Sequence, residues 1–87
     1  MNVYLLYNRQ TRGERQLSDY AKRLDDAQAP YELLDADSPQ GINLAEAFDV
    51  MGRPAIVVSR NDGSPVQIWQ DAESFPPPSE ISYLAHQ

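Results

Sequence analysis

A short apolar run framed by a proline and a turn constrains this chain more than any other feature. Residues 55–59 (AIVVS) are rich in β-branched side chains, follow Pro54 and precede the polar stretch 60–64 (RNDGS). Such a run, bounded by turn-forming residues, is typical of a buried strand. Proline lacks the N–H that a sheet ladder needs but is tolerated at a strand's first residue, so we expect the strand to begin at Pro54.

The residues after this strand predict a β-hairpin. Asp62-Gly63 is the pair in the loop that best accepts positive φ angles. After the loop, one set of alternate residues (Val66, Ile68 and Gln70) differs from the set between them (Gln67, Trp69 and Asp71). We therefore expect a return strand at an edge of the sheet, with two differently covered faces.

The first third of the chain predicts a strand, a helix and a second strand. Residues 2–7 (NVYLLY) are nearly all apolar, as in a central strand covered on both faces. Residues 11–14 (TRGE) match a capping box, and apolar residues recur at helical spacing as far as Ala27, before Pro30. Residues 31–35 (YELLD) form the second strand, which a right-handed crossover makes parallel to the first.

Two further helices are expected. Residues 35–41 (DADSPQG) favour a turn, after which Asn43 caps a short amphipathic helix that Gly52 stops. Ser79 is the predicted cap of a last helix, after an extended proline-rich stretch. The apolar residues that share one face of this last helix are Ile81, Leu84 and Ala85.

These elements predict a single α/β domain over residues 1–87, in the order βαβαββα. The parallel first pair and the terminal hairpin together give a four-stranded mixed sheet, with helices on both faces. The chain has no apolar run of the length that a membrane span needs and no N-terminal signal pattern, so we expect no membrane association and a cytoplasmic protein.

Composition excludes several classes of function. The chain carries 7 lysines and arginines against 13 acidic residues, a net charge of −6, which repels nucleic-acid backbones. Cysteine is absent, so disulfides, thiolate nucleophiles and thiolate metal ligands are all excluded. Five of the seven cations lie in one early segment, at Arg9, Arg12, Arg15, Lys22 and Arg23.

With this layout, nearly the whole chain resembles the thioredoxin fold in its minimal, glutaredoxin-sized form. That family opens with a strand ending in tyrosine, a polar loop and a cysteine pair at the helix start. Here residues 7–15 (YNRQTRGER) occupy that stretch, and Arg12 and Arg15 stand where the cysteines would be. Pro54 matches the cis-proline that opens the family's third strand, and residues 61–63 (NDG) resemble the turn that follows.

The resemblance implies a binding module and not an enzyme. Attack on a disulfide requires a thiolate, which this chain cannot supply. Non-catalytic thioredoxin-like domains recur as adaptors, and in the family the residue before the cis-proline pairs its main chain with an extended substrate. The implied binding face, for a protein or peptide partner, comprises Arg12, Gly13, Arg15, Arg53 and Pro54.

Two alternatives apply to this face. Arg12, Arg15 and Arg53 could meet at the helix N-terminus and receive a small anion, such as a phosphate, a carboxylate or a glutathione-like ligand. The simpler structural interpretation is that the arginines are solvated and pair with nearby carboxylates, and that Pro54 only shapes its turn.

No other motif predicts a catalytic, cofactor or metal site. Asp35 and Asp37 lack the spacing and the glycine of a calcium loop, and His86 has no recognisable acid–base partner. Trp69 either anchors a partner or belongs to the core. Because edge strands invite self-pairing, a homodimer through residues 66–70 is a further alternative.

Overall fold

A mixed four-stranded sheet organises the molecule in the computed structural model. The structure describes residues 1–8, 12–50, 54–70 and 74–86, with residues 12 and 13 described by their backbone alone. The elements in these ranges follow the predicted order βαβαββα. They are β1 (Asn2–Tyr7), α1 (Arg12–Asp26), β2 (Glu32–Asp35), α2 (Pro39–Ala47), β3 (Ala55–Ser59), β4 (Pro65–Trp69) and α3 (Pro78–Ala85).

The strand order is β2-β1-β3-β4. β1 runs parallel to β2 and antiparallel to β3, and β3 forms an antiparallel hairpin with β4. The prediction that the return strand lies at an edge is therefore confirmed. Gly63, in the hairpin loop, has a φ of +92°, as expected for the predicted turn.

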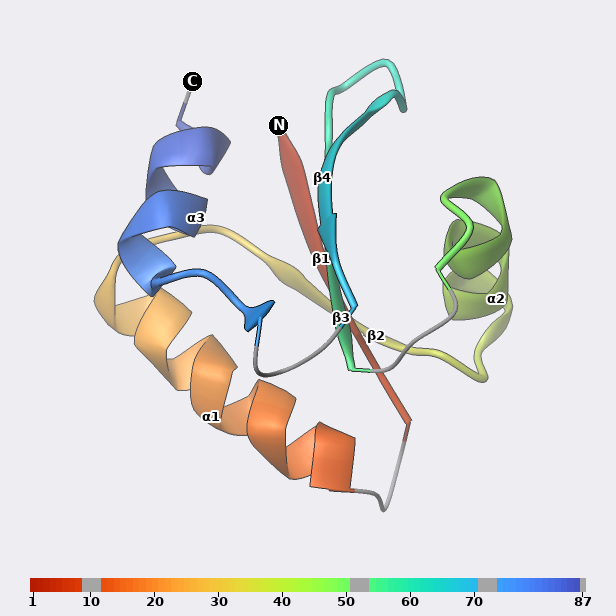
Figure 1. Cartoon of the computed structure of the whole chain (residues 1–87), viewed down its shortest axis with the longest axis horizontal. Helices are drawn as coiled ribbons and strands as arrows, with labels where there is room; N and C mark the ends of the chain where they lie inside the picture. Colours follow the sequence, from red (N-terminus) through yellow and green to blue (C-terminus); the bar gives the residue numbers. More distant parts are fainter. Residues whose placement is uncertain (9–11, 51–53, 71–73, 87) are drawn as a thin grey trace.

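Helices cover both faces of the sheet. α1 and α3 lie on one face and α2 on the other, as Figure 1 shows. Consecutive residues of β1 serve the two cores: Leu5 packs on the α1 side and Leu6 on the α2 side, and both are fully buried. This double coverage explains why β1 is an almost continuous apolar run. Within the described ranges, no helix is long and apolar enough to cross a membrane.

The predicted start of the second helix is wrong. α2 begins at Pro39, and Ser38 is its N-cap, with the Oγ accepting a hydrogen bond from the Gly41 N–H at 3.1 Å. Proline suits the first position of a helix because its missing N–H would have no partner there. Asn43 consequently lies inside the helix, while the predicted stop at Gly52 lies outside the described residues.

The predicted cap of the last helix is also wrong, because α3 begins at Pro78 and Ser79 lies within its first turn. Pro77 occupies the N-cap position and makes no side-chain capping bond. The predicted apolar face is confirmed: Ile81 is fully buried, and Leu84 and Ala85 pack against the same core. Thr11, the predicted cap of α1, lies outside the described residues.

Two helices end in left-handed residues that are not glycine. Gln28 follows α1 with a φ of 58°, and Asp49 follows α2 with a φ of 55°. After each, the next N–H reaches back to the carbonyl five residues earlier, from Ala29 to Leu24 and from Val50 to Ala45, both at 2.9 Å. These are Schellman motifs, which satisfy the last carbonyls of a helix.

Candidate functional site

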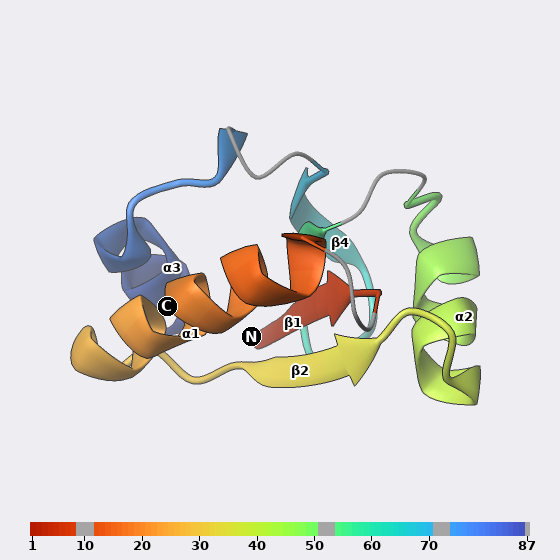
Figure 2. The ribbon, with the colours of Figure 1, turned by 90° about the horizontal axis from the view of Figure 1, so that it is seen from below.

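The strand register brings Pro54 to the end of the sheet at which β1 ends. Leu6, near the end of β1, pairs with Ala55, the first residue of β3. Pro54 directly precedes Ala55 and therefore lies beside the end of β1, the element that comes before α1 in the chain. In Figures 1 and 2 the first turn of α1 lies near the start of β3. The helix start and the Pro54 turn thus share one end of the molecule.

The predicted site residues differ in how far the structure describes them. Pro54 is buried, and Arg15 is exposed on the first turns of α1. Arg12 and Gly13 are the first two residues of α1, but the side chain of Arg12 lies outside the described part, as does the whole of Arg53. Convergence of the three arginines therefore stays a prediction.

The surroundings of Arg15 are of mixed charge. This side chain lines an open hollow of about 450 Å³ on the outer surface of α1, together with Glu14, Ser18 and Asp19. Two carboxylates beside one guanidinium reduce the positive potential that a small anion would meet. Arg15, the one arginine of the three whose side chain is described, is accordingly less suited to an anion than the sequence suggested.

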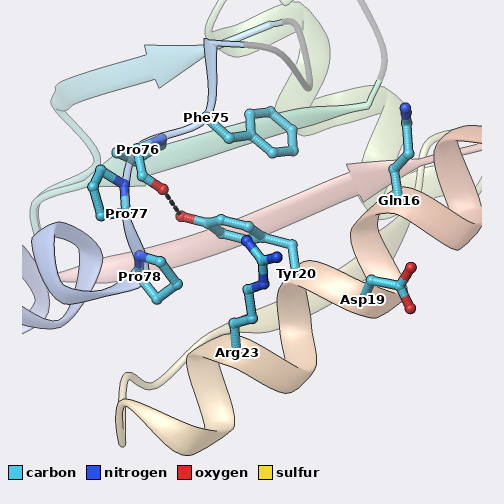
Figure 3. Close-up of a pocket in the computed structure, with 8 residues that line it drawn as sticks. All are labelled: Gln16, Asp19, Tyr20, Arg23, Phe75, Pro76, Pro77 and Pro78. Atoms are coloured by element: carbon cyan, nitrogen blue, oxygen red, sulfur yellow. Dashed lines mark hydrogen bonds between the residues drawn. The ribbon is translucent and has the colours of Figure 1, made fainter.

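A second hollow adjoins the first at Asp19 and extends the site along α1 (Figure 3). It has a volume of about 510 Å³ and lies between α1 and the segment that leads into α3. Its lining residues are Gln16, Asp19, Tyr20 and Arg23 from α1, and Phe75, Pro76, Pro77 and Pro78 from the segment.

Tyr20 forms the floor of this hollow and holds the segment at residues 75–78, which is its opposite wall. Its hydroxyl donates a hydrogen bond of 2.6 Å to the carbonyl oxygen of Pro76, drawn as a dashed line in Figure 3. Its ring contacts that of Phe75, with centroids 5.3 Å apart and planes inclined at 58°, a favourable aromatic arrangement. The proline segment is thereby held against α1.

Burial raises the pKa of Tyr20 to about 12, with a further increase from the charge of Glu80 and an opposing effect of Arg23. The phenol is therefore neutral at physiological pH and acts as a hydrogen-bond donor. The resulting groove combines apolar proline and phenylalanine surfaces with three polar groups. These are the Arg23 guanidinium, the Asp19 carboxylate and the Gln16 amide, and all three side chains are exposed. Such a surface suits an extended peptide, which offers both apolar side chains and backbone polar groups.

Sequence reasoning missed this hollow, although one signal for it was present. Tyr20 lies on the apolar face of α1, and a buried tyrosine hydroxyl needs a partner. Trp69, the other aromatic candidate, is half-buried and packs against the core on the α1 side. Among the described residues, no group of three histidine, aspartate or glutamate side chains could hold a metal ion.

No protein-family model, curated protein or solved structure matches this chain. What the protein does is therefore inferred from its own residues and their geometry.

Proposed function

We propose that this chain is a non-catalytic thioredoxin-like binding module that pairs with an extended segment of a partner protein. The binding face comprises the first turn of α1 and the turn at Pro54. The element order βαβαββα, the mixed sheet and the coverage of both faces support the thioredoxin-like assignment. The absence of cysteine supports a role without redox chemistry.

The observation that carries the proposal is the position of Pro54. It is buried, directly precedes β3 and lies at the end of the sheet where α1 begins. A proline at this position shapes the main chain just before the strand. An extended segment of a partner would pair with that main chain.

The two hollows on α1 extend this face. They adjoin at Asp19, and together they run from Glu14 in the first turn to the Phe75–Pro78 wall. A partner segment that pairs beside Pro54 would continue along α1 and place an apolar side chain against Tyr20 and Phe75. Peptide specificity would then come from the groove and affinity from main-chain pairing.

The alternative is a receptor for a small anion at Arg12, Arg15 and Arg53. The carboxylates of Glu14 and Asp19 beside Arg15 weigh against it. The two functions differ in their dependence on salt, because salt screens the attraction between a small anion and the guanidiniums but does not screen main-chain pairing.

Fluorescence anisotropy with a panel of labelled neutral and acidic extended peptides tests the proposal. We expect binding that persists at about 0.5 M salt, where the Debye length falls to about 4 Å from about 10 Å at 0.1 M. Binding should also survive Arg15→Glu and be weakened by Pro54→Ala. Pro65→Ala, at the exposed first residue of β4, is the matched control and should bind normally.

If Pro54→Ala unfolds the domain, Gln16→Ala and Arg23→Ala test the groove with exposed residues, and each should weaken peptide binding. Binding that follows Arg15 and disappears with salt would support the anion receptor instead. Binding that is unaffected by every substitution on this face would refute the module as proposed.

A further inference from the structure

A separate hollow lies on the other side of the sheet, between α2 and the edge strand β2. It has a volume of about 440 Å³. One wall is a single stripe of α2, because its residues are spaced by three or four positions; the other wall comes from β1 and β2. The lining residues are Gln40, Asn43, Leu44 and Ala47 on α2, and Tyr4, Glu32 and Leu34 on the strands.

The register of the sheet sets the strand wall. Tyr4 pairs with Glu32 across the parallel β1 and β2 strands, and Leu34 lies two residues further along on the same face. Tyr4 is half-buried, Glu32 is exposed and Leu34 is 8% exposed. The wall therefore offers a carboxylate and an aromatic ring above an apolar floor.

The polar groups of this hollow are available to a ligand. Gln40 and Asn43 are exposed on α2. In the part of the chain that the structure describes, the side chains of Tyr4, Glu32, Gln40 and Asn43 are not engaged in hydrogen bonds or ion pairs with other residues. One carboxylate and two amide carbonyls can thus accept hydrogen bonds from the same bound group.

The charge distribution favours a cation here. No lysine or arginine occurs between residues 24 and 52, the stretch that contains β2 and α2. Most of the cations lie in or next to α1, which covers the opposite face of the sheet. The same stretch carries seven carboxylates, at Asp25, Asp26, Glu32, Asp35, Asp37, Glu46 and Asp49.

We propose that this hollow receives an arginine side chain from a basic segment of a partner protein. The guanidinium would pair with the Glu32 carboxylate, stack on the Tyr4 ring and donate its remaining N–H groups to Gln40 and Asn43. Arginine fits better than lysine, because its planar group has five donors and stacks on aromatic rings. Its aliphatic stem would lie on Leu34 and Leu44.

The test is an amide-resolved NMR titration of the whole chain with an N-acetylated, C-amidated pentapeptide containing one arginine among alanines and glycines. The lysine and citrulline counterparts are titrated in parallel at low salt. We expect shifts in residues 32–34 and 40–47, an affinity about threefold lower for lysine, and no binding of the neutral citrulline peptide.

Variants separate this hollow from general acidity. Glu32→Gln should weaken arginine binding about fivefold, whereas Glu46→Gln, at an exposed residue of α2 outside the hollow, should leave it nearly unchanged. Tyr4→Phe keeps the ring and should retain binding. Equal losses from the two glutamate variants, equal binding of citrulline, or shifts confined to other acidic residues would overturn the proposal.

Discussion

Replacing Gly41 with alanine sets two physical effects against each other within one helix. Gly41 lies in the first turns of α2 and has no special φ angle. By helix propensity alone, alanine would stabilise the domain by about 1 kcal/mol. In the fold, however, a Cβ at this position would overlap the carbonyl oxygen of Asp35, and would lie 2.9 Å from the Asp35 carbonyl carbon and 3.0 Å from the Ala36 Cα.

All three of these atoms belong to the backbone, so the overlap cannot be relieved by rotating a side chain. α2 would have to move away from the end of β2. Overpacking of this kind costs about 1 to 3 kcal/mol, and here it also disturbs the Ser38 cap. With overpacking at about 2 kcal/mol and the weakened cap at about 1 kcal/mol, less the propensity gain of about 1 kcal/mol, we expect a net loss of about 2 kcal/mol. The total stability of a chain of this length is roughly 4 to 13 kcal/mol.

Urea unfolding followed by Trp69 fluorescence and far-ultraviolet circular dichroism measures the effect. Asn43→Ala is the matched control, because Asn43 is exposed on the same helix and should show only the gain in propensity, about 0.5 kcal/mol. If Gly41→Ala instead raises the free energy of unfolding, the close approach of α2 to β2 is wrong.

Three further outcomes follow from the same structure. Gln28→Gly and Asp49→Gly should each stabilise the domain by about 0.5 to 1 kcal/mol in urea unfolding, because both positions have positive φ; a loss in either would contradict the Schellman ends. Tyr20→Phe should cost about 1 to 2 kcal/mol in the same assay, because the Pro76 carbonyl loses its donor. The third outcome is measured as the free energy of unfolding against alkaline pH. The pKa of Tyr20 is about 12 in the folded chain and 10.0 ordinarily. The contribution of Tyr20 to the free energy of unfolding is therefore full below pH 10 and is lost as the pH rises to 12. Tyr20→Phe should reduce this alkaline loss of stability and leave the share that is due to Tyr31, whose pKa is also raised by burial and Asp25. An unchanged slope of the free energy of unfolding against pH would contradict the role of Tyr20.

Local sequence patterns predicted the strands well. The apolar run at residues 2–7 became β1 with the expected bounds, and the run at residues 55–59 became β3, which begins one residue after the expected start at Pro54. The start of α2 was missed because serine, proline and glycine favour both turns and helix starts. Gly41 belongs to the helix for a tertiary reason, its contact with the Asp35 backbone, which local spacing does not contain.

The candidate sites depend on contacts between distant parts of the chain. The shared face of Pro54 and the α1 start was expected only from the resemblance to the thioredoxin fold; the pairing of β1 with β3, which brings the ends of these strands together, was not predicted. The Tyr20–Pro76 bond joins residues 56 positions apart, and the Tyr4–Glu32 pair depends on strand register. Neither contact can be predicted from local sequence; the one indication is that Tyr20 lies on the apolar face of its helix.

The most direct test of the binding module is an amide-resolved NMR titration of the whole chain with neutral and acidic extended peptides, and separately with phosphate, sulfate and glutathione. We predict that peptides shift the amides flanking Pro54 and those of the first turns of α1, and that high salt leaves these shifts in place. Shifts at the same residues from the small anions, abolished by salt, would contradict it, as would peptide shifts confined to the β4 edge.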